Sequence, residues 1–591
     1  MKINYKLIIA IGCLFPLVMP SCDESYLEVK PFASLSESTV STKAGVDGLL
    51  IGAYSLLDGG GATGGNYTTG WEQMAAPDDA RLGTESGAWA GDAFMWDPNA
   101  SNFNDKWTFL YAAVKRCNDV ILLIPKAKDA TAAEALQFEA EAKFLRGIYY
   151  LQLAIGWKNV PWIDETISYN ANNYIVPNNV VDIYSKIEAD FVFAAENLSD
   201  TKSQVGRGNK WAAKSFLAKA LMFQKKFSAA KTVLDDIMLN GKTSNGKKYA
   251  LLPLYEDNFR TATKHGSESV FTVQMSVNDG ANGPNGNVTD YYNGTFGGPA
   301  TCCYGWYQPT YDLVDAYQTD AVTGLPLLDT YQNTPVPHDN GLTSAQAFTP
   351  YTGTLDSRLD WNVGRRGIPY LDWGVHPGKA WVRNQFNSGP YNCVKNIAYQ
   401  ARVATDRQGG GGATNTPYNM IRYADVLLWA AECEVEVGTL SKAEEYVNVV
   451  RARAANPAGF VKQYLDNAKP LGGFSNTPAA NYKVGLYSGE FAANGKTYAR
   501  KAVRFERRLE LAMEHHRYFD MRRYDGNEFD QAARHNWILS VEGPRLSNPT
   551  NNYLQGKFNK NRDELWPIPL TQIDLMVDKD GKKVLVQNPG W

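Results

Sequence analysis

The stretches ALMFQKKFSAAKTVLDDI (220–237) and EVGTLSKAEEYVNVVRARA (436–454) share one helical spacing of apolar residues, and this spacing indicates the fold. In each stretch, apolar or small residues fall at offsets 0, 3, 7 and 10, which is the period of one helix face. The matching positions are Phe227, Ala230, Leu234 and Ile237 in the first stretch and Leu440, Ala443, Val447 and Val450 in the second. The same helical face therefore recurs in two distant parts of the chain.

Each of these apolar faces follows a predicted helix with small residues, Ala218 and Ala220 in one case and Ala430 and Ala431 in the other. Small side chains let paired helices approach closely, and stacked pairs then bury their apolar faces against each other, as in tetratricopeptide (TPR) repeats. The pattern predicts TPR-like helical hairpins. Plain helical hairpins that belong to no repeat family are the alternative.

Helical periodicity also predicts helices over residues 46–58, 106–125, 132–156 and 179–198, and alternation predicts a strand over 269–277. Residues 250–420 are otherwise punctuated by Gly, Asn, Pro and Thr, which is typical of loops. The expected fold class is mainly α: a TPR-like helical hairpin scaffold with long irregular loop insertions and a few short strands. We place the TPR-like helices around 106–240 and 420–455, and loop-rich insertions around 59–105 and 280–420.

The 591 residues carry a formal net charge of -3, which gives no electrostatic case for nucleic-acid binding.

After Cys22 come Cys117, Cys302, Cys303, Cys393 and Cys433, without a CxxC pair or zinc spacing. We expect buried thiols and no cofactor or metal. A strained disulfide between Cys302 and Cys303 is the alternative. Asp578, Asp580 and Gly581 resemble part of a calcium loop, but the glutamate ligand is missing, and a hairpin with an Asp-Gly turn is the better interpretation.

The N-terminus has the features of a bacterial lipoprotein signal. Lys2 and Lys6 precede an apolar run over 7–19, and Ser21 stands directly before Cys22. The run is too short to span a bilayer, which takes about 20 residues. We expect residues 1–21 to be a signal peptide, Cys22 to carry lipid, and 22–591 to form a single domain. Such signals usually have Leu where this chain has Met19, and an ordinary secretory signal with Cys22 free is the alternative.

The order of segments resembles the SusD/RagB family of outer-membrane nutrient-uptake lipoproteins, from Cys22 to Trp591. Family-like segments are EAKFLRGIYYLQLAIGWKNVPWIDE (141–165), GRGNKWAAKSFLAKALMFQKKFSAA (206–230), IRYADVLLWAAECEVEVG (421–438), VRFERRLELAMEHHRYFDMRRY (503–524), ELWPIPLTQI (564–573) and the closing QNPGW (587–591). The segment 500–591 looks like the family's C-terminal signature. One departure is His515, where family members often have glycine.

The resemblance implies a lipid-anchored outer-membrane protein that faces the cell exterior, and Asp23 and Glu24 after the lipid cysteine resemble the family's surface-export signals. It implies capture of a glycan, or less often a peptide, and delivery to a SusC-like TonB-dependent transporter. A third alternative is that the protein serves only as an assembly scaffold. The resemblance implies no catalysis, and the chain has no GxSxG, HExxH or P-loop motif. A glycoside hydrolase needs a positioned carboxylate pair, and nothing in the sequence singles one out.

Aromatic residues in loops are the candidate ligand contacts, because Trp and Tyr rings offer flat apolar area to the C–H face of a sugar. The candidates are Trp89, Trp96, Tyr304, Trp306 and Trp373, with Asp78, Asp79 and Arg81 as polar candidates. Each ring could instead anchor its own loop in the core. We expect core positions for the tryptophans that lie in or beside helical patterns: Trp107, Trp157, Trp211 and Trp429.

The stretch RFERRLELAMEHHRYFDMRR (504–523) is densely charged. Arg504, Arg508, Glu510, Glu514 and Arg517 recur at three- and four-residue helical spacing. Such a set could serve acid–base catalysis, but a partly buried ion network that locks helices together is the better interpretation.

Overall fold

The structure is a computed structural model. It describes residues 37–58, 78–82, 90–167, 169–170, 173–174, 176–280, 285–287, 294–300, 305, 307–395, 397–408, 413–526 and 528–591. Helices make up most of its regular structure and the strands are short, so the mainly-α prediction is confirmed. No helix in these ranges is both long enough and apolar enough to cross a membrane.

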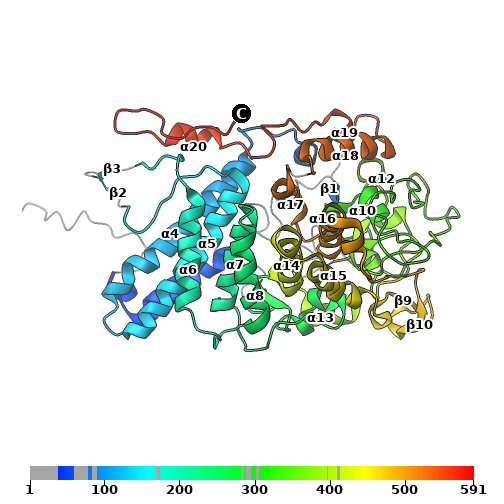
Figure 1. Cartoon of the computed structure of the whole chain (residues 1–591), viewed down its shortest axis with the longest axis horizontal. Helices are drawn as coiled ribbons and strands as arrows, with labels where there is room; N and C mark the ends of the chain where they lie inside the picture. The colour runs from blue at the N-terminus through cyan, green and yellow to red at the C-terminus, as the bar shows by residue number, and fades with distance from the viewer. Residues whose placement is uncertain are drawn as a thin grey trace, which may run out of the picture.

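The first helical group fills the left side of Figure 1. It consists of α2 (Glu37–Val40), α3 (Lys43–Tyr54), α4 (Ser101–Leu123), α5 (Ala132–Trp157), α6 (Ile183–Asn197), α7 (Lys210–Phe223) and α8 (Phe227–Asn240). α5 begins at a capping box, in which the Thr131 hydroxyl accepts from the Glu134 N–H and the Glu134 carboxylate accepts from the Thr131 N–H. Each helix packs on the next along the chain from α3 to α8.

The second helical group lies in the middle of Figure 1 and consists of α14 (Tyr423–Val437), α15 (Leu440–Ala454), α16 (Glu490–Glu510) and α17 (Arg517–Tyr524). The pairs α7/α8 and α14/α15 are the two predicted hairpins, and α8 packs against α14, so the hairpins stack. Their repeat positions Ala230, Leu234 and Ile237 are fully buried, as are Ala443, Val447 and Val450. The TPR-like prediction is confirmed.

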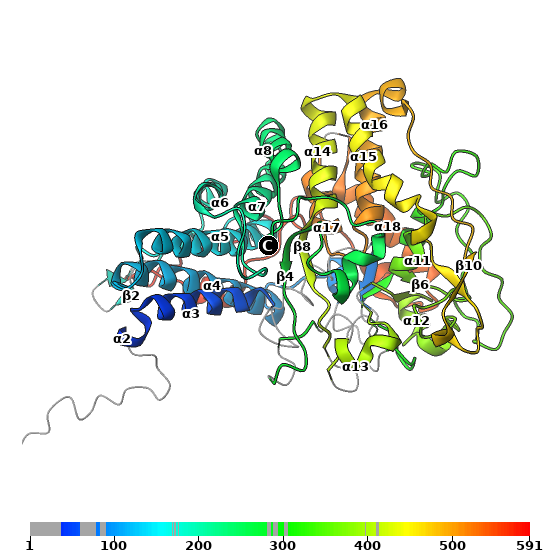
Figure 2. The same ribbon diagram turned by 90° about the horizontal axis from the view of Figure 1, so that it is seen from below.

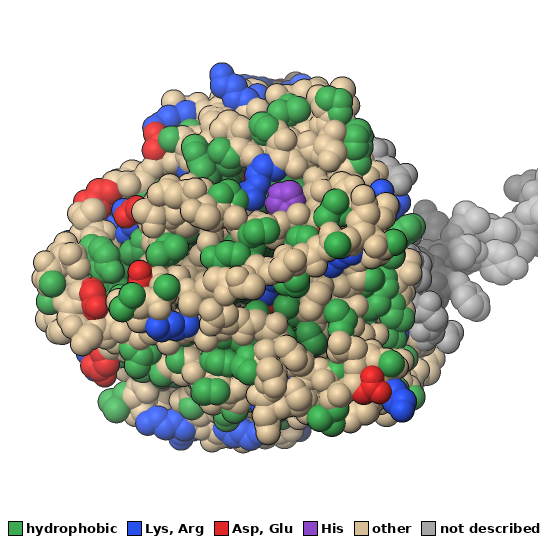
Figure 3. Space-filling model, turned by 90° about the vertical axis from the view of Figure 1, so that its right-hand side faces the viewer, with side chains coloured by type: hydrophobic (Ala, Val, Ile, Leu, Met, Phe, Trp, Pro, Cys, Tyr) green, Lys and Arg blue, Asp and Glu red, His purple; other side chains and the backbone are tan. Residues whose placement is uncertain are grey.

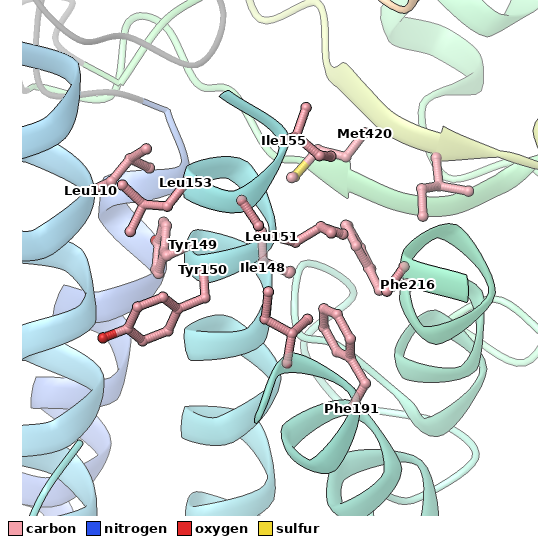
Figure 4. Close-up of a cluster of buried hydrophobic side chains, with 14 of the residues drawn as sticks. Leu110, Ile148, Tyr149, Tyr150, Leu151, Leu153, Ile155, Phe191, Phe216 and Met420 are labelled. Carbon is pink, nitrogen blue, oxygen red and sulfur yellow. The ribbon is translucent and has the colours of Figure 1, made fainter. Parts of the chain in front are cut away.

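The core of the first group is built from side chains that converge from several helices. Figure 4 shows Leu151 of α5, Phe191 of α6 and Phe216 of α7 gathered together, with Met420 of strand β8 (Tyr418–Arg422) above them. Leu110 of α4 lies beside Leu153 on another side of α5. Each fully buried side chain of this size contributes about 1.5–3 kcal/mol. Trp107, Trp157, Trp211 and Trp429 are also buried, as predicted. Cys117 and Cys433 are buried free thiols and Cys393 is buried as well, whereas Cys302 and Cys303 lie outside the described residues.

The remaining chain forms a loop-rich lobe on the right of Figure 1, attached to the second helical group. It is tied together by two-stranded antiparallel pairs and short helices. The pairs are β1 (Ala80–Leu82) with β5 (Tyr307–Pro309), β6 (Val363–Gly364) with β7 (Asn392–Cys393), and β9 (Lys462–Tyr464) with β10 (Phe474–Pro478). The short helices are α10 (Tyr311–Ala316), α11 (Leu359–Asn362), α12 (Gln385–Ser388) and α13 (Val403–Asp406).

Strand β4 (Ser269–Val273) pairs with β8 and is shorter than the predicted 269–277. Figure 2 shows this pair between the first helical group and the lobe. The small pair β2 (Tyr169–Asn170) and β3 (Asn173–Tyr174) lies at the far left of Figure 1. The C-terminal helices are α18 (Gln531–Arg545), α19 (Asn552–Gln555) and α20 (Leu570–Leu575), and a Val577–Lys583 bridge closes the predicted Asp-Gly hairpin.

A buried ion network joins the second helical group to the lobe. Arg422 lies between three carboxylates, at 2.9 Å from Glu268, 2.5 Å from Glu510 and 2.9 Å from Glu514. Arg508 and Arg517 extend ion pairs to Asp312 and Asp78. The predicted network is confirmed and is buried more completely than expected. Among the described residues Arg504 forms no ion pair, and its guanidinium lies over the ring of Tyr524 at 4.3 Å instead.

His515 has a φ of 67°, a backbone conformation that favours glycine. The ring is buried, stacked near Tyr418 with ring centroids 6.2 Å apart and edge-on to Tyr307 at 4.9 Å. The His515 ring thus makes contacts that a glycine could not make, although its backbone conformation is less favourable than it would be for glycine.

Candidate functional site

The polar candidates Asp78, Asp79 and Arg81 are buried, with 0, 2 and 2% of their surface exposed. Asp78 accepts from Arg517 at 2.7 and 2.9 Å, Asp79 accepts from Arg508 at 2.8 Å, and Arg81 donates to Glu542 at 2.8 Å. Burial disfavours a charged Asp78, but the guanidinium groups around it hold its pKa well below the usual range.

These three side chains hold β1 against α16 to α18 and offer no surface to a ligand. We therefore correct the sequence-based assignment: Asp78, Asp79 and Arg81 belong to the internal ion network and are not retained as ligand contacts.

Trp96 also lies in the core. Its ring is 9% exposed, stacks on Trp591 with ring centroids 6.3 Å apart, and packs edge-on to Phe94 and Phe103. Its indole N–H donates to the Gly91 carbonyl at 2.8 Å. We correct this assignment as well, because Trp96 fastens the C-terminal residue to the first helical group and has almost no free surface. Trp89, Tyr304, Trp306 and Cys22 lie outside the described residues.

Trp373 remains as a candidate and lies half-buried on the loop between β6 and β7. Its indole N–H donates to the Ala398 carbonyl at 2.8 Å, and the Arg407 guanidinium lies 5.8 Å from its ring. The Tyr464 hydroxyl holds this loop, because it accepts from the Gly374 N–H at 3.0 Å and donates to the Leu371 carbonyl at 2.6 Å. The ring is therefore presented on a rigid loop.

Two further aromatic rings lie beside this loop and were missed from sequence. Trp381 is half-buried and its ring lies 3.8 Å from where a Cβ on Gly374 would be. Phe296 is 38% exposed, and its N–H donates to the Trp381 carbonyl at 3.0 Å. We call Phe296, Trp373 and Trp381 the aromatic ledge. In the sequence Trp381 follows closely after Trp361 and Trp373, and this clustering of tryptophans is the signal that pointed toward it.

A pocket of about 270 Å³ opens between the β9–β10 hairpin and neighbouring loops. Four of its lining side chains are aromatic: Trp361, Tyr399, Phe460 and Phe474. We call it the aromatic pocket. Leu371, two residues before Trp373, also lines it, so the pocket adjoins the ledge.

Figure 3 views the lobe from the right-hand side of Figure 1. Hydrophobic side chains are spread over this face and acidic ones are few. The two carboxylates that line the aromatic pocket are engaged, Asp360 by Arg365 and Glu256 by Arg260. The geometry thus offers ring faces for binding, and we assign no reaction to it.

Comparisons with known proteins agree with this architecture. The model of the SusD family matches residues 267–591, and a second model, described as "Starch-binding associating with outer membrane", matches residues 25–222. SusD-like protein P2 of Formosa agariphila is 26% identical over 513 residues, which is 82% of this chain and 80% of that protein.

Two solved structures from Bacteroides thetaiotaomicron share the fold. A SusD homolog superposes with a TM-score of 0.68 at 21% identity, over 94% of this chain and 99% of the other. Surface glycan-binding protein A in complex with laminarihexaose gives a TM-score of 0.57 at 19% identity, over 93% and 99%. The family match spans more than half of the chain, and the chain belongs to the SusD family.

Proposed function

We propose that this protein is a lipid-anchored protein of the outer-membrane surface that captures a glycan and delivers it to a SusC-like TonB-dependent transporter. The anchor would be Cys22. The description of the matched family model supports an outer-membrane location, and the laminarihexaose complex of a neighbour with the same fold supports a glycan as the ligand.

The observation that carries the binding proposal is the aromatic ledge. Trp373, Trp381 and Phe296 are partly exposed, and hydrogen bonds hold the Trp373 indole and the Phe296 backbone in place. A pyranose ring has an apolar C–H face that packs on such rings, while its hydroxyls remain free to hydrogen-bond with neighbouring polar groups and water. Trp89, Tyr304 and Trp306 lie outside the described residues, so the proposed site rests on the ledge alone.

Capture without turnover also fits the charged groups. The two carboxylates that line the aromatic pocket are held by arginines, whereas a glycosidase needs two carboxyl groups free to act on one glycosidic bond. We propose that the protein binds and does not cleave.

A binding panel tests the proposal. The purified full chain is titrated by calorimetry with polysaccharides and with peptides, beside Trp373→Ala and the control Trp162→Ala, a half-buried tryptophan on the first helical group. We expect a glycan to bind and Trp373→Ala to weaken it at least about tenfold, as for truncation of a buried aromatic anchor. Binding of peptides alone would refute the glycan assignment. Release of shortened sugars would refute the absence of catalysis.

A further inference from the structure

The aromatic pocket is a rigid cavity with four ring walls. The Trp361 indole N–H donates to the Gly459 carbonyl at 2.7 Å, and the Tyr399 hydroxyl donates to Glu256 at 2.7 Å. Phe474 stacks on Tyr464, with ring centroids 5.1 Å apart and planes 27° apart. Phe460 packs on Tyr482 at 5.2 Å. Each ring is therefore held in place before any ligand arrives, which lowers the entropy that binding must overcome.

Both carboxylates of the pocket are neutralised by a neighbour on the protein. Asp360 accepts from Arg365 at 2.6 and 2.9 Å and from the Tyr482 hydroxyl at 2.5 Å. Glu256 accepts from Arg260 at 3.1 Å as well as from Tyr399. A cationic ligand would have to compete with these arginines.

Lys462 is the remaining charged side chain of the lining, and it forms no ion pair with any residue in the described part of the chain. It lies on β9, where its register partner on β10 is Pro478, and the β10 residues Ser475 and Asn476 also line the pocket. The lining therefore has one ammonium group without a counter-charge, beside a hydroxyl and an amide that can hydrogen-bond.

We propose that the aromatic pocket is a second saccharide site, separate from the ledge, and that it takes an acidic sugar residue whose carboxylate or sulfate pairs with Lys462. The ring of the sugar would pack on Phe474 and Phe460. This inference rests on the proposed glycan-binding function and names the charge of the ligand.

The size of the pocket limits the ligand. Its volume of about 270 Å³ lies just below the ~300 Å³ at which sites for drug-sized ligands begin. It therefore suits a terminal or single protruding residue of a glycan, while the chain of the glycan continues over the ledge.

The test uses the full chain and two sets of probes of matched length. The acidic set is oligogalacturonate, oligoguluronate and sulfated galactan fragments, and the neutral set is laminarihexaose, maltohexaose and cellohexaose. The pocket variants are Phe474→Ala and Lys462→Gln. Their controls are Phe386→Ala, an exposed phenylalanine on α12, and Lys469→Gln, an exposed lysine on the same β9–β10 connection. Trp381→Ala reports on the ledge.

We expect tighter binding of an acidic probe than of the neutral ones. Phe474→Ala should weaken that binding at least about tenfold. Lys462→Gln should weaken it about two- to fivefold, as for an exposed ion pair, and added NaCl should have the same effect on the wild type but little on Lys462→Gln. Both controls should match the wild type in affinity, and all variants should keep a cooperative thermal unfolding transition.

The outcomes separate this inference from the proposed function. If no probe binds the wild type, both proposals fail. If a glycan binds and only Trp381→Ala weakens it, the pocket inference fails and the proposed function stands. Equal affinity for neutral and acidic probes, or equal losses with Lys462→Gln and Lys469→Gln, would overturn the assignment of an acidic ligand.

Discussion

Glu510 is the centre of the buried ion network, and Glu510→Gln is the most informative change to the scaffold. The side chain is fully buried and meets three guanidinium groups: Arg422 at 2.5 Å, Arg358 at 2.9 Å, and Arg453. Glutamine keeps the shape of the side chain but removes its charge, so three buried arginines lose a counter-charge.

The magnitude follows from the pKa of Glu510. Burial alone would raise it, but Arg453, Arg422 and Arg358 lower it from 4.5 to about 2. A shift of that size corresponds to roughly 3 kcal/mol of stabilisation at neutral pH. Removing one partner of a buried ion pair destabilises by about 3–5 kcal/mol, which agrees. We therefore expect Glu510→Gln to lower the free energy of unfolding by about 3 kcal/mol at pH 7.

The pH dependence has a defined sign. The folded state holds Glu510 deprotonated more strongly than the unfolded state does, so its contribution is complete above pH 4.5 and is lost as the pH falls toward 2. The wild type should therefore lose stability over this window more steeply than Glu510→Gln.

Urea-induced unfolding followed by tryptophan fluorescence, at pH 7 and in steps down to pH 3, measures both effects. The control is Glu528→Gln, which removes a carboxylate that is 48% exposed and pairs with Arg500 at the surface. An exposed pair contributes about 0–1 kcal/mol. If Glu510→Gln destabilises no more than Glu528→Gln, or if it leaves the acid dependence unchanged, the reasoning about the network is wrong.

Two further predictions concern packing and anchoring. Gly208→Ala should lower the free energy of unfolding in urea by about 1–3 kcal/mol, because its Cβ would stand 2.2 Å from the Phe144 ring. The control Gly48→Ala in α3 meets nothing within 4 Å and should be neutral or stabilising. Equal effects of the two changes would contradict the close approach of Gly208 to Phe144. Cys22→Ser should move the protein from the membrane fraction to the soluble fraction of expressing cells, since the lipid chains supply the anchor, and unchanged membrane association would remove Cys22 from that role.

The helical scaffold could be predicted because its signals are local. The offsets of Phe227, Ala230, Leu234 and Ile237 fix one buried helix face, and three of these four residues are fully buried in α8. The half-buried Phe227 begins the helix, where the face is only partly covered. Local periodicity thus determined both hairpins, and the order of segments determined the family.

The site was predicted only in part, because its geometry depends on partners that are distant in sequence. The sequence around Asp78 and Asp79 predicts carboxylates on an exposed loop. In the structure Arg517 of α17 binds Asp78, Arg508 of α16 binds Asp79, and both carboxylates are buried. Trp96 follows a Gly-rich stretch, which predicts a ring at the surface. In the structure the C-terminal Trp591 stacks on it and covers it.

Trp381 shows the opposite error. Its clustering with Trp361 and Trp373 in the sequence is a weak signal, and its proposed role as a ligand contact depends on the neighbouring Gly374 loop and on Phe296. Trp373 was identified correctly as a ring on an irregular loop, and its role as a ligand contact stays a prediction.

The measurement that tests the central claim most directly is a calorimetric titration of wild type and Trp381→Ala with the polysaccharide that binds best in the panel. We expect an affinity loss of at least about tenfold for Trp381→Ala, with a cooperative unfolding transition retained. An affinity equal to that of the wild type, or a loss no larger than that of Trp162→Ala, would contradict the claim that the aromatic ledge holds the glycan.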